Sequence, residues 1–343
     1  NVPSVADALR MLKDQADRTP PPQWVRVVGG WSEIQFAERR MPTLEEINAA
    51  APDTPVFVLH LYGRALLNKA ALNALGFDAS TPNPPGGVIE RDSNGNPTGL
   101  LIARPSALIL YSTLAKGPRL PLEDQINSTR HYMREMNRLG ITSVIDAGGG
   151  GQNYPEDYDV IQRLHDAGQL TIRVAYNLFA QTAGSELSDY ERWVQITEPG
   201  QGDDMLRMNG AGENLAWSAA DFENFLEPRP DPAPIMESEL EPIVELLAEN
   251  KWPFRIHATY DETIDRFLGV FERVNGRQPF QTRFIIDHAE TVSAQNIERI
   301  KALGGGIAIQ HRMAYQGEYF VSRYGAEAAK ATPPIRKMLE TDV

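Results

Sequence analysis

The chain has 343 residues, and its 46 acidic and 33 basic side chains give a formal net charge of −13. Nucleic acid and an anionic membrane surface both repel a protein of this charge, so neither is expected as a partner. Cysteine is absent, which excludes disulfides and thiolate ligands and leaves His, Asp and Glu to hold any metal ion. No apolar run is long enough to cross a bilayer and no signal peptide is visible, so we expect a cytoplasmic protein.

The first third of the sequence predicts short helices and strands without a regular alternation. Thr43 and Glu46 have the spacing of a capping box, which predicts the start of a helix. His60 ends a continuous apolar strand and is one candidate for a residue that faces a site. The expected elements are helices over Val5–Ala16, 43–50 and 66–75, and strands over 24–28 and 55–61.

Residues 84–101 predict a β-hairpin. An Asn94-Gly95 step lies between two apolar arms, and Asn-Gly is a preferred dipeptide for the tight turn between antiparallel strands. We expect this hairpin to be an excursion from the main domain. It could serve as a lid over a site or as a contact to a second copy of the chain, so a homodimer is the protein partner that we consider.

From Ile141 onward, strand-like and helix-like segments alternate. This order is typical of a parallel sheet and suits a (β/α)₈ (TIM) barrel, with a doubly wound sheet as the alternative. No Gly-x-Gly-x-x-Gly pattern opens a helix after a strand, so nucleotide binding is not supported. The expected strands are 141–147, 170–178, 204–208, 252–257, 283–288 and 306–311.

The segment 251–290 contains the residues that best indicate a function. Two apolar runs end in His257 and His288, and the residues between them have apolar side chains at helical spacing. A strand, a helix and a second parallel strand place both strand ends at the same edge of a sheet. We therefore expect the two imidazoles to point into one space, as the ligands of a zinc-type ion do. For either residue alone, the alternative is a histidine that is hydrogen-bonded in the core.

Four further polar residues follow or end strands of this series. His311 ends the next strand, and Arg312 after it could hold a substrate carboxylate or form a structural ion pair. Tyr260 follows the strand of the first histidine, and Asn209 ends the short strand at 204–208. We expect these residues to contact substrate or to support the metal ligands.

Three acidic residues lie next to the histidines. Asp287 and Glu290 flank the second histidine and could fix an imidazole tautomer, although Asp287 could equally pair with a neighbouring arginine. Asp261 directly precedes the expected helix between the two histidine strands, and we expect it to be the N-cap of that helix.

A set of short segments, spread in order over nearly the whole chain, resembles a known family. The segments are Trp31 with the polar residues after it, Ala49-Ala50-Ala51-Pro52-Asp53-Thr54-Pro55-Val56-Phe57, Leu67-Asn68-Lys69-Ala70-Ala71-Leu72, Gly86-Gly87-Val88-Ile89-Glu90-Arg91, Leu139-Gly140-Ile141-Thr142-Ser143-Val144, His257-Ala258, and Asp287-His288-Ala289-Glu290. On these segments the chain resembles the amidohydrolase superfamily, and within it the YtcJ-like branch (amidohydrolase family 3).

The resemblance implies a TIM barrel in which the histidines of strands five and six, here His257 and His288, bind the metal. It also implies hydrolysis of carbon–nitrogen bonds other than peptide bonds, by water that the ion activates. The family's His-x-His on strand one, its small β-sandwich and its catalytic strand-eight aspartate have no counterpart in these residues. We therefore expect 1–343 to be one incomplete barrel domain, truncated at both ends, with the catalytic aspartate beyond Val343.

The lysine that bridges two ions in some family members is also missing. The short strand ends as Leu206-Arg207-Met208-Asn209, and no lysine occurs between Gly117 and Asn250. We therefore expect a single ion, zinc or another divalent metal, and we expect this chain alone to bind it weakly and to be inactive. The alternatives are a barrel that binds a small molecule without catalysis and a metal-free lyase or isomerase. In every case the expected partner is a small molecule.

Overall fold

The computed structural model describes residues 2–29, 32–84, 87–104, 107–148, 152–221, 225–226 and 228–343. Trp31 and Gly86, which carry part of the family resemblance, lie outside these ranges, as do residues 149–151. The chain divides into two compact units. Unit 1 comprises Asn1–Leu120, Phe222–Pro228 and His311–Gly325, and unit 2 comprises Pro121–Asp221, Arg229–Gln310 and Ala326–Val343. Among the described residues, no helix combines the length and apolar character that crossing a bilayer requires.

Unit 1 is built on a five-stranded sheet with the strand order β1-β2-β3-β5-β4. Its strands are β1 (Val25–Val27), β2 (Val56–His60), β3 (Arg64–Leu67), β4 (Gly87–Arg91) and β5 (Pro97–Ala103). Its helices are α1 (Val5–Ala16), α2 (Leu44–Ala50), α3 (Lys69–Leu75), α4 (Leu108–Leu114) and α11 (Met313–Tyr324), with a 3₁₀ turn at Glu33–Gln35.

Local signals in unit 1 explain where several elements begin. The predicted capping box is confirmed, because the Glu46 N–H donates to the Thr43 hydroxyl and the Thr43 N–H donates to the Glu46 carboxylate. The antiparallel pairing of β4 with β5 forms the predicted hairpin, but β5 also pairs with β3, so the hairpin is part of the sheet of unit 1 and not an excursion from it. The helix predicted over 66–75 begins only at Lys69, because Leu66 and Leu67 pair with β2 as part of β3 and Asn68 caps the helix.

Unit 2 is built on a six-stranded sheet in which all neighbouring strands are parallel, in the order β11-β10-β9-β8-β7-β6. The strands are β6 (Ser143–Asp146), β7 (Arg173–Leu178), β8 (Leu206–Ala211), β9 (Phe254–Ala258), β10 (Phe284–His288) and β11 (Gly306–Ala308). The helices are α5 (Leu122–Arg138), α6 (Asp159–Asp166), α7 (Glu186–Ile196), α8 (Met236–Glu249), α9 (Asp261–Arg277), α10 (Ala294–Ala302), α12 (Ala326–Lys330) and α13 (Ile335–Thr341), with 3₁₀ turns at Glu156–Tyr158 and Trp217–Ala219.

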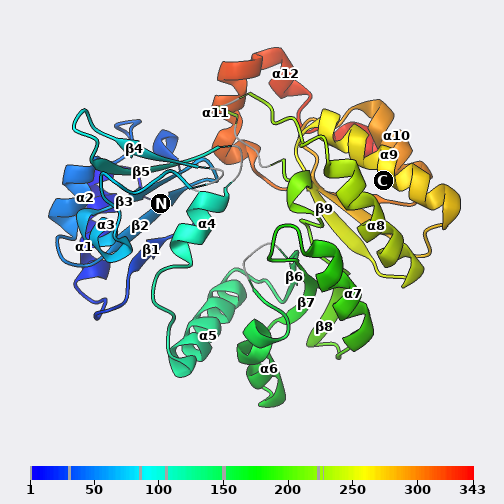
Figure 1. Ribbon diagram of the computed structural model, residues 1–343, viewed down its shortest axis with the longest axis horizontal. Coiled ribbons are helices and arrows are strands. Elements are labelled where there is room, and N and C mark those ends of the chain that lie inside the picture. The colour runs from blue at the N-terminus through cyan, green and yellow to red at the C-terminus, as the bar shows by residue number, and fades with distance from the viewer. Residues whose placement is uncertain are drawn as a thin grey trace. The chain divides into compact units, whose positions relative to one another are not determined.

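The helices α7, α8 and α9 pack against this sheet (Figure 1). The apolar residues of α9 repeat at helical spacing and are fully buried, among them Ile264, Phe267 and Phe271. They join Phe254 of β9 and Phe284 of β10 in the main core of the unit. The predicted α/β fold with a parallel sheet is therefore confirmed, and the core holds β9 and β10 side by side.

The start of α9 differs from the prediction. Tyr260 is the N-cap residue, and Asp261 is the first residue of the helix. The Asp261 carboxylate instead accepts hydrogen bonds from the Ser293 N–H at 2.6 Å and the Asn296 side-chain amide at 2.8 Å. Asp261 therefore joins the start of α9 to the start of α10, a tertiary contact that the local sequence pattern does not show.

Candidate metal centre

The carboxyl ends of β8, β9 and β10 bring one carboxylate and two imidazoles together. Glu213 lies two residues beyond β8, His257 lies in β9, and His288 is the last residue of β10. The Glu213 N–H donates to the Ala147 carbonyl at 2.8 Å, and the His257 N–H donates to the Glu213 carbonyl at 2.6 Å. These backbone bonds hold Glu213 against the neighbouring strand ends.

The side-chain donors of this cluster are close enough to share one ion. Oε2 of Glu213 lies 3.4 Å from Nε2 of His288 and 3.9 Å from Nδ1 of His257. The two imidazole centroids are 4.2 Å apart, and one donor atom from each residue lies within 4.8 Å of the others. Ligands bound at about 2.1 Å in a tetrahedron lie about 3.4 Å apart, so two imidazoles and one carboxylate at these separations fit a zinc-type ion.

An unusual backbone conformation brings His288 into the cluster. In register, Asp287 pairs with His257 and His288 pairs with Ala258. Side chains alternate along a strand, so a regular His288 would point away from His257. His288 has a φ of 81° and Ala289 a φ of 52°, both in the left-handed region. Such strain costs on the order of 1–3 kcal/mol per residue and is concentrated at functional sites, where the surrounding structure holds it in place.

The charges of the cluster are coupled. Burial alone would raise the pKa of Glu213, but hydrogen bonds to His257 and His288 hold it well below its ordinary value. Burial alone would lower the pKa of His257, but Glu213, with smaller contributions from Asp221 and Glu290, raises it to about 9. Burial and the neighbouring His257 lower the pKa of His288. The two rings therefore stabilise the ionised form of the Glu213 carboxylate.

The other predicted residues of unit 2 lie around this cluster in different roles. Asp287 accepts two hydrogen bonds from the Arg255 guanidinium, one of them from Nε at 2.8 Å. Of the two roles considered for Asp287 from the sequence, the structure shows the pairing with a neighbouring arginine. Glu290 is fully buried, and burial raises its pKa to about 7. The Asn209 side-chain amide donates to Asn177 at 3.1 Å.

Tyr260 is also fully buried, with the Arg229 guanidinium 5.3 Å from the centre of its ring. For Tyr260, as for Asp287, Glu290 and Asn209, contact with a substrate stays a prediction.

Three predicted residues belong to unit 1. The His311 ring contacts Tyr315 edge to face with the centroids 5.3 Å apart, and the buried Arg312 is the N-cap residue of α11. The buried His60 donates from Nε2 to the Glu33 carboxylate at 2.6 Å. Roles for His311 and Arg312 at the metal centre stay predictions.

Sequence reasoning missed two acidic residues. The argument from the missing lysine stopped at Asn209, but β8 continues to Ala211 and Glu213 follows it. A carboxylate two residues after a strand end was the available signal. Asp221 falls in the segment between β8 and α8, where no periodic pattern indicates burial, yet its side chain is fully buried 3.7 Å from Nε2 of His257.

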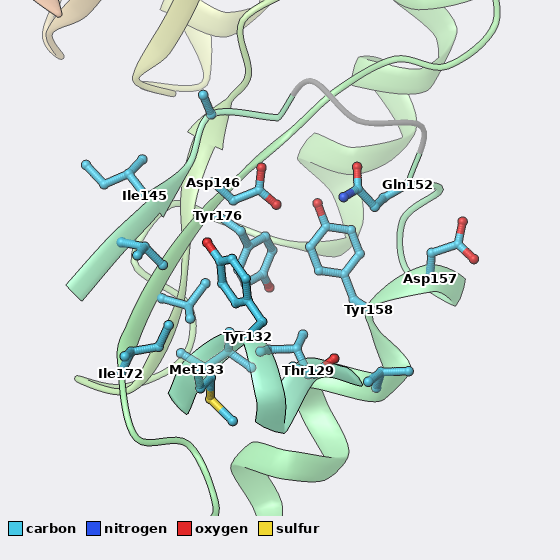
Figure 2. A pocket seen from close by; sticks show the side chains of 16 residues that line it. Thr129, Tyr132, Met133, Ile145, Asp146, Gln152, Asp157, Tyr158, Ile172 and Tyr176 are labelled. Atoms are coloured by element: carbon cyan, nitrogen blue, oxygen red, sulfur yellow. The ribbon is translucent and has the colours of Figure 1, made fainter. Parts of the chain in front are cut away.

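A separate cavity of about 490 Å³ lies in unit 2, lined by residues of α5 and α6 and by the sheet from β6 to β8. Figure 2 shows Asp146, at the end of β6, near the hydroxyl of Tyr158, with Tyr132 and Tyr176 also in the lining. Burial raises the pKa of Asp146. None of the three clustered donors lines this cavity, so it is distinct from the candidate metal centre.

The fold and the cluster define a class of protein, namely an α/β protein with a polar site at the carboxyl ends of parallel strands. The sequence pattern of the Amidohydrolase family matches residues 1–343, and the chain belongs to that family. Its membership of the YtcJ-like branch of the amidohydrolase superfamily, expected from the sequence, is confirmed.

Two named relatives are similar to this chain in sequence, and one solved structure is similar to it in fold. N-substituted formamide deformylase of Arthrobacter pascens is 23% identical over 357 residues, covering 98% of this chain and 63% of that protein. "Putative amidohydrolase YtcJ" of Bacillus subtilis (strain 168) is 24% identical over 331 residues, covering 94% of this chain and 60% of that protein. An uncharacterized metal-dependent hydrolase from Pyrococcus horikoshii OT3 has a similar fold, with a TM-score of 0.64 and 21% identity over 98% of this chain and 63% of that one. The chain thus spans 60% to 63% of the length of these three proteins.

Proposed function

We propose that the whole protein is a metal-dependent hydrolase of carbon–nitrogen bonds other than peptide bonds, and that Glu213, His257 and His288 hold its ion. The observation that carries this proposal is the convergence of the three donors within 4.8 Å at neighbouring strand ends. Family membership supports hydrolase chemistry, and the relative named as an N-substituted formamide deformylase supports an amide-type substrate.

We propose one ion, because the three donors face a single space. Two imidazoles and one carboxylate are ligands that zinc accepts, and a catalytic zinc site commonly has three protein ligands and an open position. The carboxylate of Glu213 contributes one negative charge, so the ion with these ligands keeps a net positive charge. When bound, such an ion lowers the pKa of a water molecule toward neutrality and supplies the nucleophile.

The chain's own residues set the conditions for this chemistry. The side chain of His257 is 6% exposed and that of His288 is 14% exposed, so the protein itself keeps most water away from the two rings. The Arg255–Asp287 pair ties β9 to β10 next to the two rings and fixes their spacing. We assign no general base among these residues, and we expect the whole protein to supply it. We further propose that the parallel sheet of unit 2 is part of a (β/α)₈ barrel.

The test compares metal content with turnover in the whole protein. The protein is stripped with a chelator, reloaded with Zn²⁺, analysed for bound metal, and assayed on N-substituted formamides, N-acyl amines, dipeptides and esters. We expect one ion per chain and zinc-dependent turnover of the non-peptide amides.

Variants identify the ligands. His257→Ala and His288→Ala should each lower turnover by at least about a thousandfold, which corresponds to the several kcal/mol of stabilisation that a catalytic metal supplies. His131→Ala is the matched control, since His131 is exposed on α5. Full turnover without metal, or in both ligand variants, would refute the proposal that these histidines hold a catalytic ion.

A further inference from the structure

A buried carboxylate lies on the far side of His257 from Glu213. Asp221 is fully buried, and its Oδ1 lies 3.7 Å from Nε2 of His257. On the other side of the same ring, Nδ1 lies 3.9 Å from the Glu213 carboxylate, in the space shared with His288. The imidazole therefore has one carboxylate opposite each of its two nitrogens.

Backbone hydrogen bonds fix the Asp221 side chain in this place. Oδ1 accepts from the Thr259 N–H at 2.8 Å, and Oδ2 accepts from the Thr259 and Tyr260 N–H groups at 3.1 Å each. Thr259 and Tyr260 directly follow β9, the strand that carries His257. The carboxylate is thus anchored to the end of that strand and cannot turn away from the ring without giving up these bonds.

The backbone bonds alone do not explain why this residue is an aspartate. Burying an ionised carboxylate costs several kcal/mol unless charge and hydrogen bonds compensate it. A neutral asparagine oxygen could accept from the same N–H groups without that cost. A carboxylate differs in that it accepts at both oxygens and donates at neither while it is ionised. Nε2 of His257 lies 3.7 Å from this acceptor, so the geometry favours a proton rather than a lone pair on the nitrogen that faces Asp221.

We propose that Asp221 is a positioning residue that keeps the proton of His257 on Nε2, so that the Nδ1 lone pair points at the ion. The inference rests on the metal centre proposed above. A carboxylate behind a histidine ligand fixes the ring's tautomer and orientation and makes the other nitrogen a better donor, and its loss typically lowers metal affinity about 10- to 100-fold. Asp221 itself touches neither the ion nor the substrate.

The decisive variant is Asp221→Asn in the whole protein. One amide oxygen can still accept from the backbone N–H groups after β9, but the amide NH₂ can meet Nε2 only as a donor. This favours the tautomer with the proton on Nδ1, and a protonated Nδ1 cannot bind the ion on the Glu213 side of the ring. Titration of the chelator-treated protein with Zn²⁺ alone should give an affinity about 10- to 100-fold below wild type. The metal-free variant should unfold at nearly the wild-type temperature.

Asp261→Asn is the matched control. Its carboxylate also accepts a backbone N–H, that of Ser293, in the loop after the neighbouring strand, but no ligand imidazole lies beside it in the contacts described. We expect its Zn²⁺ affinity to stay at the wild-type value. If both variants lose affinity equally, a general effect of loop stability is responsible, and the proposal is overturned.

A spectroscopic measurement avoids dependence on any variant. In ¹⁵N-histidine NMR spectra of the Zn²⁺-loaded wild-type protein, the His257 proton should be found on Nε2, and a proton on Nδ1 would overturn the inference. The outcomes also separate the two proposals. A wild-type protein that binds no Zn²⁺ overturns the metal centre and this inference together. Wild-type affinity in Asp221→Asn overturns only the role of Asp221.

Discussion

At the scale of single residues, the ion pair beside the two histidines is buried, so its stability depends on both partners being present. Arg255 and Asp287 are diagonal neighbours on β9 and β10, and their side chains are only 13% and 5% exposed. Burial raises the pKa of Asp287 while the Arg255 guanidinium opposes that rise. Each charge is therefore compensated mainly by the other, and the pair is sensitive to the loss of either partner.

We predict that Arg255→Met lowers the free energy of unfolding by about 3–5 kcal/mol, because it leaves a buried carboxylate without its partner. The double variant Arg255→Met/Asp287→Leu should recover most of this loss, since an apolar pair of similar volume needs no compensation. Urea denaturation of the metal-free proteins measures both, and a double-mutant cycle gives the coupling. A loss below about 1 kcal/mol in the single variant would show that the pair is screened like a surface pair.

The sequence could predict only some residues of the candidate metal centre. The histidine pair follows from local patterns, namely two apolar runs with a helical segment between them. The register places the two histidines one residue out of step, and only the left-handed conformation of His288 brings its ring into the cluster. No residue type in the sequence indicates that conformation. Glu213 and Asp221 reach opposite sides of the His257 ring from segments without periodicity, so their contributions depend on tertiary contacts alone.

At the scale of elements, the end of β8 positions Glu213 through a very close approach of backbones. A Cβ on Gly212 would lie 2.4 Å from the Ala147 carbonyl oxygen and 2.7 Å from the Cα of Gly148. The Gly212 N–H also donates to the Leu178 carbonyl at 2.6 Å. Glycine at this position therefore lets the chain after β8 contact the ends of both β6 and β7. The sequence predicted the strand too short, since a bulge in its pairing with β7 precedes Gly210.

We predict that Gly212→Ala lowers the free energy of unfolding by about 1–3 kcal/mol, since the methyl group must displace backbone rather than a flexible side chain. The displacement moves Glu213 away from the histidines, so Zn²⁺ affinity should fall at least about tenfold. Gly269→Ala is the control. Its Cβ would meet only the end of Arg273 at 3.8 Å inside α9, so it should stabilise the helix by about 0.5–1 kcal/mol and leave the affinity unchanged. Wild-type affinity in Gly212→Ala would show that Glu213 is not a ligand or is not placed by this turn.

At the scale of the whole molecule, each unit has cores of its own. Two apolar clusters lie among residues of unit 1, and the large cluster around β9, β10 and α9 lies in unit 2. The alternating strands and helices of unit 2 could be predicted from the sequence, because a helix separates each parallel strand from the next one along the chain. The sheet of unit 1 was not readable as one sheet, because it mixes parallel and antiparallel pairs. Whether residues 1–343 behave as the single domain expected from the sequence depends on how the two units are coupled in unfolding.

Hydrogen exchange with and without Zn²⁺ measures that coupling. All three proposed ligands lie in unit 2, and a ligand stabilises only the states that bind it. At a free Zn²⁺ concentration about 100 times the dissociation constant, the gain is about 2.7 kcal/mol, which slows exchange through unfolding about a hundredfold.

We predict this slowing for the amides of β8, β9 and β10, with little change in β2 and β3 of unit 1. His288→Ala should abolish the effect, and His131→Ala should retain it. Equal slowing in both units would contradict the expectation that the two units unfold independently. It would show that the metal stabilises one cooperative domain, because every element that unfolds together with the ligands is then protected.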